Sequence, residues 1–416
     1  SIAVADTAIA AAEVPLPSGG SAGLSGSSLV TSAAFGDGPG NAELLDDAIA
    51  VISLSDGDHA YRAGLADSVT AVARGFGLDA LLAAGEAQSY AMPLGGGLSL
   101  SMAVAGDPLA AAHDPWAPEG EPLALQLSGA LGAATGLRLG IDVTAADQLA
   151  AAAGLADGLF WSADETMRPL GLLTGRGNGL SLDHALGDTT RLSLGLFDGE
   201  TANGLLADGA AGNGATLGQA GLRHGFASGA SFGVDVGLLA ESAAMLGSQG
   251  AGALSTEAGA DTRFLTVGGG VPLGDRLELF GSMTLATSEV GESADSLLTG
   301  WDSVQSNALA LGAIARDVAA DGDRLGLLVG QPLRAYRAEA TVTVPVDVTA
   351  DGAATLQSER VDLTPSGREI DFQLAYDRPL APGMGLSTWL LFQLQPGHDA
   401  DADPAYGAGL RFRFGF

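Results

Sequence analysis

The final strand of the chain carries the pattern that most constrains its fold. Between residues 406 and 416, apolar residues occupy every second position, and glycine or arginine fills the positions between them. The apolar positions are Tyr406, Ala408, Leu410, Phe412, Phe414 and Phe416. Side chains of a β-strand point alternately to opposite faces, so this segment predicts a strand with one apolar face. Free chain ends fray in water, and the aromatic end therefore favours a face covered by lipid, as in an outer-membrane β-barrel.

The distribution of apolar residues along the whole chain agrees with this prediction. Hydrophobic residues make up 47% of the 416 residues and charged residues only 16%. Even so, no apolar run is long enough for a transmembrane helix. A barrel has this composition because only every second residue of its strands meets lipid. The sequence therefore predicts an all-β fold, a transmembrane antiparallel up-and-down β-barrel, in preference to a soluble β-domain.

Connections between the predicted strands alternate between short and long. The short ones are Gly187–Thr189, Ala227–Ala230, Pro272–Asp275, Ala320–Asp323 and Ala381–Gly385. The long ones are Glu200–Ala215, Gly247–Asp261, Gly291–Asp302, Asp347–Ser366 and Gly397–Ala405. This asymmetry is typical of bacterial outer-membrane barrels, whose short turns face the periplasm and whose strand number is even. We predict about twelve strands, with fourteen or more as the alternative if strands upstream of residue 144 join the barrel. An additional hairpin is predicted to join a strand at Met167–Thr174 to the next strand through a tight turn at residues 175–179.

Upstream of these strands, one segment predicts a helix. Ala145–Leu159 is rich in alanine and leucine, and Thr144 before it is an N-cap candidate, which favours a helix of about four turns. Either this helix lies in a long loop, or it occupies the barrel lumen. In the lumen, Asp147 and Asp157 could pair with arginines on the inner wall. The arginines considered for this role are Arg168, Arg191, Arg276 and Arg324.

The chain divides into three regions. Residues 1–28 contain no aromatic residue, are rich in alanine, glycine and serine, and predict a linker. Residues 29–144 form a β-rich segment that can add strands to the barrel. The strand candidates in it are Leu98–Ala105, Leu123–Leu131 and Leu137–Val143. Residues 145–416 are predicted to form the lumen helix and the barrel.

Charge and cysteine content exclude several kinds of function. The net charge is −31, with 49 acidic and 18 basic residues, so nucleic acid would be repelled. An acidic surface fits loops that hold divalent cations at an anionic cell surface, and it also fits a protein of a salt-loving organism. Cysteine is absent, which leaves neither disulfides nor thiolate metal sites.

Catalytic and cofactor motifs do not emerge from the sequence. Ser21 lies in the sequence GGSAG, but the nucleophile elbow requires a strand before it and a helix after it, and here it lies in a segment rich in proline and glycine. The five histidines are scattered and lack metal-binding spacing. We therefore predict neither a catalytic site nor a cofactor.

One acidic loop is a weak calcium candidate. Asp399, Asp401 and Asp403 could offer the oxygen ligands that Ca²⁺ prefers. The loop lacks the glycine and the closing glutamate of an EF-hand, so a solvated acidic loop is favoured.

Several segments of the chain resemble one family in the right order. Its last ~250 residues look like the β-domain of autotransporters, and most of the chain is similar to the C-terminal regions of alphaproteobacterial subtilisin-like autotransporter peptidases. The segments that carry the resemblance are Ala34–Asp37, Asp56–Leu65, Leu298–Asp302, Gly326–Leu333, Ser358–Glu369 and Pro396–Asp401. The peptidase domain of that family, with its Asp, His and Ser motifs, is absent from this chain.

The resemblance implies a translocator of type V secretion. Such a protein exports an N-terminal passenger and anchors it in the outer membrane, and residues 29–144 would join passenger to barrel. The implied partners are outer-membrane lipid and lipopolysaccharide, the passenger, and the barrel assembly machinery, which would recognise the apolar face of the last strand. Its recognition residues would be Tyr406, Leu410, Phe412, Phe414 and Phe416. The alternative is a stand-alone outer-membrane pore or a structural surface protein.

Overall fold

The structure is a computed structural model of the chain. It describes residues 12–41, 48–54, 57–65, 68–71, 87–105, 122–149, 159–160, 166–201, 213–349 and 353–414. Most regular elements in these ranges are β-strands. The α-helices that it describes, α3 (Ala145–Gln148) and α5 (Pro169–Leu172), have four residues each. No helix within the described ranges has the length and hydropathy needed to cross a membrane. The prediction of an all-β fold is confirmed.

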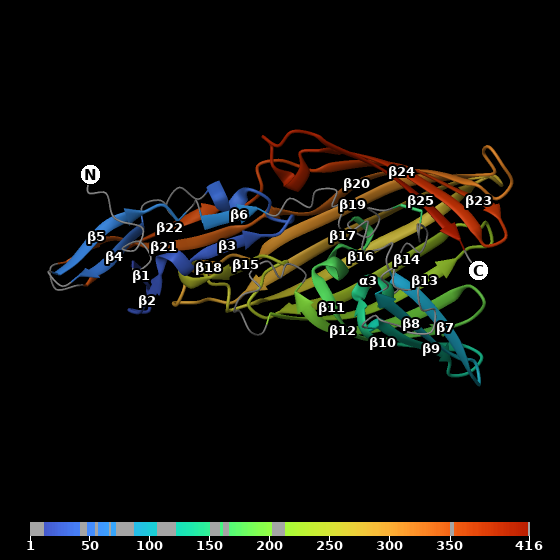
Figure 1. Ribbon diagram of the computed structural model, residues 1–416, viewed down its shortest axis with the longest axis horizontal. Helices are drawn as coiled ribbons and strands as arrows, with labels where there is room; N and C mark the ends of the chain where they lie inside the picture. Colours follow the sequence, from blue (N-terminus) through green and yellow to red (C-terminus); the bar gives the residue numbers. More distant parts are fainter. Residues whose placement is uncertain are drawn as a thin grey trace, which may run out of the picture.

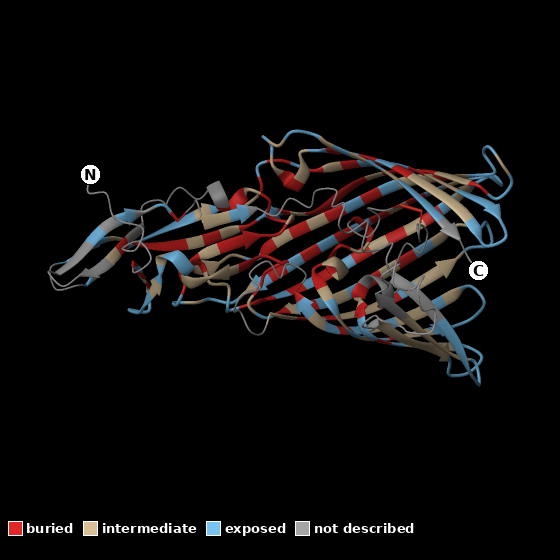
Figure 2. Ribbon diagram, in the orientation of Figure 1, coloured by how far each residue is buried: buried red, intermediate tan, exposed pale blue. Residues whose placement is uncertain are grey.

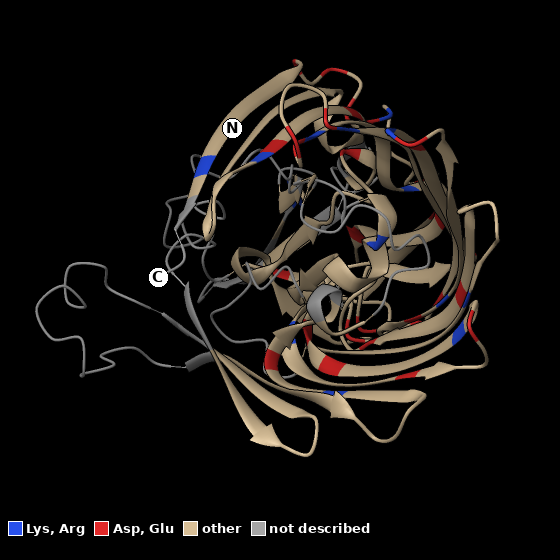
Figure 3. Ribbon diagram, turned by 90° about the vertical axis from the view of Figure 1, so that its right-hand side faces the viewer, with Lys and Arg blue, Asp and Glu red and all other residues tan. Residues whose placement is uncertain are grey.

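One antiparallel sheet of fifteen strands forms the wall of the molecule (Figure 1). In order, its strands are β7 (Ala87–Gly95), β8 (Leu98–Ala105), β9 (Pro122–Ala130), β10 (Thr135–Thr144), β11 (Thr174–Ala185), β12 (Thr190–Thr201), β13 (Gly214–Gly225), β14 (Ser231–Glu241), β16 (Ala260–Leu273), β17 (Leu277–Val290), β19 (Val304–Arg316), β20 (Arg324–Arg337), β23 (Ile370–Ala381), β24 (Met384–Leu394) and β25 (Ala405–Phe414). Spatial order follows chain order, so the wall is an up-and-down meander. Seen from one end, it curls around a central space (Figure 3).

The number of strands differs from the favoured prediction. We expected twelve strands, with fourteen or more as the alternative, and the described residues contribute fifteen strands to this sheet. The difference arises in residues 87–144, whose four strands β7 to β10 all join the wall. Because neighbouring strands are antiparallel, an odd number makes the edge strands β7 and β25 run in the same direction. Within the described residues, no ladder joins these two edges.

The two faces of the wall separate side chains by type (Figure 2). On β17, Phe280 and Thr284 are buried on the inner face, whereas Leu279 and Met283 on the outer face are 43% and 44% exposed. Outward apolar positions on other strands are Leu194, Leu196, Leu222, Val236, Leu238, Leu309, Leu311, Leu327, Leu374, Leu390, Phe392, Leu410 and Phe412. An apolar belt this extensive requires a partner, and lipid is the partner that a barrel wall of this pattern has.

The two rims of the wall are unequal. At one rim the strands are joined by short turns at residues 186–189, 226–230, 274–276, 317–323 and 382–383. At the opposite rim the connections are long, and those between β14 and β16, between β17 and β19 and between β20 and β23 contain further strands. We name them the short-turn rim and the long-loop rim. The predicted alternation of short and long connections is confirmed.

Three small sheets extend the molecule beyond the long-loop rim (Figure 1). Their strands are β1 (Glu13–Pro15), β2 (Ser21–Gly23), β4 (Ala48–Leu54) and β5 (Gly57–Ala63); β3 (Ser28–Thr31), β6 (Val69–Ala71) and β15 (Gln249–Ala251); and β18 (Leu298–Trp301), β21 (Glu339–Val348) and β22 (Ala354–Asp362). Short 3₁₀ turns accompany them at η1 (Leu24–Gly26), η2 (Gly38–Asn41), η6 (Gly252–Leu254) and η7 (Pro396–His398). One buried cluster joins N-terminal residues such as Val14 and Phe35 to loop residues such as Leu254 and Val342.

Two local predictions are wrong. Within the predicted linker, residues 12–28 form β1, β2 and η1, and Val14 is fully buried in the cluster at the long-loop rim. The proline and glycine content there serves tight turns between short strands. The hairpin predicted around residues 175–179 does not form, because β11 runs straight through these positions and α5 precedes it. These glycines serve close contacts rather than a turn, because a Cβ on Gly177 would overlap the backbone of Asp198 on β12 and a Cβ on Gly179 would overlap Gln148 on the inner face.

Candidate functional site: the long-loop rim and the lumen

Residues 27–38, which we name the rim segment, hydrogen-bond to the loop that follows β14. The Ala253 N–H donates to the Ser27 hydroxyl at 2.9 Å. The Ser32 N–H donates to the Ser248 hydroxyl, also at 2.9 Å. Both bonds join positions more than two hundred residues apart in the chain, so tertiary contacts hold this segment in place.

The rim segment also binds to the far side of the rim. The Ala34 carbonyl accepts a hydrogen bond from the Ala335 N–H at the end of β20, at 2.7 Å. The Asp37 carboxylate accepts one from the Ser366 N–H at 2.9 Å. Together with the contacts to the β14 loop, these bonds fasten the segment to two separate parts of the rim.

Close backbone contacts fix the path of the rim segment. Gly36 has a φ of 48°, and a Cβ at this position would overlap the carbonyl of Gly397. A Cβ on Gly38 would overlap the carbonyl of Leu363 in the same way. Phe35 between them is fully buried. The backbone can approach the loops this closely because glycine has no side chain.

His398 holds the loop before β25 against β20 and β23. It is fully buried, its Nδ1 accepts from the Glu369 N–H at 2.8 Å, and its Nε2 lies 3.1 Å from the Leu333 carbonyl. With Nδ1 accepting, Nε2 carries the proton and donates to Leu333, which defines a neutral ring. Burial lowers the pKa of His398 from 6.5 to about 4, the bond to Leu333 opposes this change, and the charges of Arg334 and Arg368 add to it.

The Glu369 carboxylate completes this cluster. It accepts hydrogen bonds from the Gly397 N–H at 2.6 Å and from Gln393 Nε2 at 2.9 Å. Arg334 donates to the carbonyls of Pro365 and Gly367 at 2.8 and 2.7 Å. Three of the segments that carry the family resemblance therefore converge at one place on the rim. These are Ala34–Asp37, Ser358–Glu369 and Pro396–Asp401.

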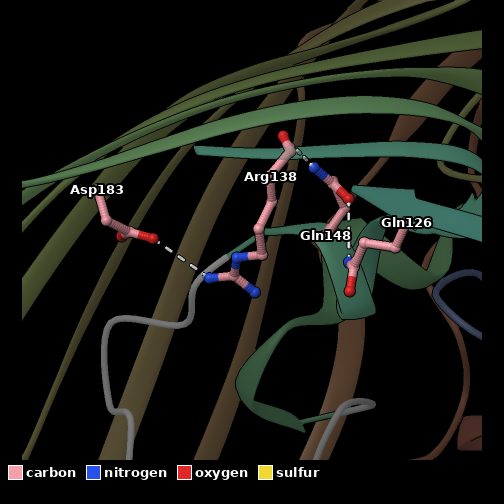
Figure 4. Close-up of polar contacts among 4 residues, drawn as sticks. All are labelled: Gln126, Arg138, Gln148 and Asp183. Atoms are coloured by element: carbon pink, nitrogen blue, oxygen red, sulfur yellow. Dashed lines mark hydrogen bonds and ion pairs between the residues drawn. The ribbon is translucent and has the colours of Figure 1, made fainter. Parts of the chain in front are cut away.

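Between β10 and β11 the chain turns back against the inner face of the wall, where Gln148 holds it (Figure 4). Gln148 is fully buried, its Nε2 donates to the Arg138 carbonyl at 3.0 Å, and its Oε1 accepts from Gln126 Nε2 at 3.5 Å. The Arg138 guanidinium forms an ion pair with Asp183 at 3.2 Å. We name the described residues between β10 and β11 the lumen segment.

Glycines of the inner wall make room for the lumen segment. Gly140 on β10 pairs with Gly179 on β11, and a Cβ on either residue would overlap Gln148. On the next strand, a Cβ on Gly195 would overlap Leu149. These glycines leave room on the inner face for Gln148 and Leu149, and a larger residue at any of them would force these side chains to move.

The lumen segment makes a second contact on other strands of the wall. Phe160 packs against the inner face of β20, where a Cβ on Gly326 would overlap its ring. The rings of Phe160 and Phe280 lie 5.7 Å apart between centroids. A cavity of ≈ 30 Å³, room for about one water molecule, separates Leu149 from Asp235 and the other lining residues on β13, β14 and β16. The lumen segment thus touches the inner wall on several sides.

The lumen segment and the rim segment meet at the long-loop rim. A small cavity there is lined by Ser32 and Ala34 of the rim segment and by Leu173 after α5. Leu333 and Glu369 complete its lining. The described part of the lumen segment is therefore continuous with the cluster around His398.

The predicted lumen helix is described only in part. Its first turn forms α3, while residues 150–158, which include Asp157, lie outside the described residues, as does the side chain of Asp147. Of the arginines considered as partners, Arg324 pairs with Asp377 of the wall at 2.9 Å. The pairing predicted for Asp147 and Asp157 stays a prediction.

The predicted assembly signal lies at an edge of the wall. Tyr406, Leu410 and Phe412 are 84%, 60% and 52% exposed on the outer face of β25. Phe414 belongs to β25, although its side chain is not described, and Phe416 lies outside the described residues. Their recognition by an assembly machinery stays a prediction.

The weak calcium candidate has a local structural role. The Asp399 carboxylate accepts a hydrogen bond from the Asp401 N–H at 2.8 Å, which closes a turn, and Asp403 is exposed. Among the residues that the structure describes, no three metal-binding side chains form a group that could hold an ion.

Sequence reasoning missed Gln148, His398 and the inner-wall glycines as the residues that organise this site. A signal for the glycines exists, because Gly177 and Gly179 follow the same period of two as the wall. This glycine pattern resembles a tight turn as long as the side chain that packs against the glycines is unknown. His398 gave no signal, since its partners come from β20 and from the residue before β23.

Among known proteins, similarity to this chain was found only with solved structures. No family model and no curated protein matches the chain. It is similar to an OmpT of Vibrio cholerae that lacks loop L8, with 12% identity and a TM-score of 0.44 over 79% of this chain and 88% of that one. It is also similar to OprB of Pseudomonas putida, with 13% identity and a TM-score of 0.43 over 76% of this chain and 82% of that one. A third similar structure is an anion-selective porin from Comamonas acidovorans, with 12% identity and a TM-score of 0.42 over 79% of this chain and 88% of that one.

The fold class rests on the strand pairing and burial of this chain itself, because those TM-scores are too low to carry an argument. The continuous antiparallel hydrogen-bond ladders, the apolar outer belt and the unequal rims define a β-barrel protein of the bacterial outer membrane. In such a protein the short-turn rim faces the periplasm and the long-loop rim faces the cell exterior.

Proposed function

We propose that this protein is an autotransporter translocator, which exports a passenger attached on its N-terminal side and anchors it at the cell surface. The observation that carries the proposal is the rim segment, bound to the exterior rim through Ser27, Ser32, Ala34 and Asp37. The proposed role is not enzymatic and needs no cofactor.

The direction of the chain supports this proposal. β7, the first wall strand, begins at the long-loop rim, and the described residues 12–71 also lie at that rim (Figure 1). Any polypeptide attached before Ala12 would therefore continue from the exterior side of the barrel. The sequence resemblance to autotransporter barrels agrees with this direction.

Burial of the rim segment supports the anchoring part of the proposal. Phe35 and Thr31 are fully buried, and the Thr31 hydroxyl donates to the Gly36 carbonyl at 2.7 Å. A passenger that pulls on this segment would have to break a packed and hydrogen-bonded contact. Each such bond contributes about 1 kcal/mol, and the buried ring adds more.

A display experiment tests the proposal. A signal peptide and a small epitope-tagged reporter are fused before Ser1, and the epitope is detected on intact cells and then removed by added protease. We expect surface exposure with the full chain and retention of the reporter when the wall strand β25 is deleted. A reporter that stays in the periplasm while the barrel folds, as judged by heat-modifiable migration, would overturn the proposal.

Assembly through the last strand is a separate part of the proposal. Loss of Phe416 should impair insertion strongly if the barrel assembly machinery recognises this residue. Phe372→Ala removes a comparable outward ring, 37% exposed on β23, without touching the last strand. Equal amounts of both variants in the outer membrane would show that the terminal ring is no recognition signal.

The alternative function, a stand-alone pore or surface protein, has one supporting observation. The inner face carries exposed arginines near the short-turn rim, so water reaches part of the lumen. Gly195→Leu should expel Leu149 and raise conductance in planar bilayers, whereas Gly187→Leu in a turn with open space should not. High conductance of the unaltered protein would favour the pore.

A further inference from the structure

Two arginines face each other on the inner wall near the short-turn rim. Arg191 on β12 and Arg223 on β13 are direct cross-strand neighbours. Arg191 has the same parity on β12 as Phe197, which is buried on the inner face, while Leu196 is 51% exposed on the outer face. On β13, Arg223 likewise shares its face with the buried Leu217. Both guanidinium groups therefore belong to the lumen side of the wall.

No carboxylate of the described residues neutralises this pair. Asp183, on the neighbouring strand β11, is engaged by Arg138 at 3.2 Å (Figure 4). Asp235 on β14 lies over Gly221 and is only 5% exposed. Neither Arg191 nor Arg223 forms an ion pair with them, and Arg191 is exposed to solvent.

Such a pair creates a positive field at the periplasmic mouth. Like charges that lie directly opposite each other destabilise a sheet. An anion bound between the two guanidinium groups would be attracted by both. The effect is larger in a confined space with walls of low dielectric constant, which focus the field. The rest of the chain is strongly acidic, so this patch has the opposite sign to its surroundings.

We propose that Arg191 and Arg223 bind carboxylates of an acidic polypeptide segment that enters the lumen from the short-turn rim. The inference rests on the proposed export function and names the chemistry of what is exported. Residues 1–86, which precede the wall, contain eleven acidic and two basic residues, so the part of this chain that would be exported has the required charge. Two adjacent guanidinium groups match carboxylate side chains in charge and in hydrogen-bond geometry.

A binding measurement with the purified full chain tests the inference. The probe is a fluorescein-labelled peptide with the sequence of residues 41–58, which carries five acidic residues and no basic residue. We expect its fluorescence anisotropy to report binding that weakens as salt is raised. Arg191→Gln/Arg223→Gln should weaken this binding about tenfold. The matched control is Arg263→Gln/Arg360→Gln, which removes two exposed arginines outside the lumen and should leave affinity unchanged.

The absence of cysteine allows the site to be located. Ser193→Cys places a single thiol on the inner face in the row next to Arg191, and bound peptide should slow its reaction with a maleimide. Equal affinity in the two double variants, or no protection of this thiol, would overturn the inference. Displacement of the peptide by millimolar phosphate but not by chloride would assign the site to small oxyanions and also overturn it.

The outcome is separable from the test of export. If the peptide binds as expected but the reporter is not displayed, the export proposal fails while the acidic-peptide site stands. If display succeeds and the double arginine variant binds the peptide normally, only the present inference fails.

Discussion

The barrel wall and the long-loop rim use β-strands in different ways. On the wall strand β17, burial alternates, and Leu279, Met283 and Leu285 stay exposed on the outer face. On β21, at the long-loop rim, Val342, Thr343 and Val344 are buried in succession, because neighbouring elements cover both faces. One region therefore depends on lipid as its partner, whereas the other depends on contacts between distant parts of the same chain.

This difference implies that the two regions can fail separately. Loss of a lipid-facing side chain changes insertion and membrane stability, but leaves the contacts of the rim segment unchanged. Loss of a rim contact is expected to weaken the docking of residues 27–38, while the wall ladders stay paired. Paired variants separate these effects.

The largest expected effect is at Gly36. Gly36→Ala places a Cβ against the Gly397 carbonyl at a φ of 48°, and we expect it to destabilise docking of the rim segment by about 4 kcal/mol. Limited proteolysis of the folded barrel measures this loss. Gly26→Ala, where a Cβ meets open space, is the matched control and should resist protease as the unaltered chain does. Equal cleavage of both variants would contradict the assigned contact.

A wall substitution should have the next largest effect. Leu196→Arg places a charge on the lipid-facing side of β12, and we expect the free energy of unfolding in lipid vesicles to fall by about 3 kcal/mol. Leu356→Arg is the control, because Leu356 on β22 is 40% exposed beyond the long-loop rim, where water can solvate arginine. Similar losses for both variants would show that lipid does not cover the outer face of β12.

Acid should loosen the rim through His398. Its folded-state pKa of about 4 lies below the unfolded value of 6.5, so the unfolded loop binds the proton more readily. The stability that His398 contributes is present above pH 6.5 and is lost as the pH falls towards 4. At pH 5 we expect a loss of about 2 kcal/mol, measured as faster hydrogen exchange of the loop before β25.

A variant isolates this pH dependence. His398→Gln cannot titrate, so its hydrogen exchange in the same loop should depend less on pH between 7 and 4.5 after correction for the intrinsic rate. An unchanged pH dependence would assign the effect to other groups of the rim.

The smallest expected effect is at Asp37. Asp37→Ala removes the acceptor of the Ser366 N–H, and docking of the rim segment should weaken by about 1 kcal/mol. Asp275→Ala removes the same charge from an exposed turn at the short-turn rim and should not alter docking. The difference in protease sensitivity between the two variants reports the contribution of this hydrogen bond.

Local patterns were enough to predict much of the wall. The segment Leu98–Ala105 has the predicted bounds in β8, and Tyr406, Leu410 and Phe412 of the predicted apolar face lie exposed on the outer side of β25. The alternation of inward and outward positions can be predicted from sequence because lipid favours an apolar side chain at every outward position. The short turns were predictable for a related reason, since turn residues act within a few positions.

The strand number and the site were less accessible. Counting required a decision on whether Leu123–Leu131 and Leu137–Val143 join the wall, and only their pairing with β8 and β11 gives the answer. Gly140 and Gly179 gave no hint of their partner, because Gln148 contacts them only after the chain has turned back against the wall.

The sequence by itself determined the class of fold, the apolar outer belt, the alternation of the two rims and the strongly acidic character of the chain. These properties depend on residue type at a fixed spacing. The tertiary structure alone decided that residues 27–38 dock on the exterior rim, that His398 is buried and neutral, and that Arg191 and Arg223 face the lumen without an ion pair to any described carboxylate. Each of these depends on which distant segments meet, and contact between distant segments leaves no periodic trace in a single sequence.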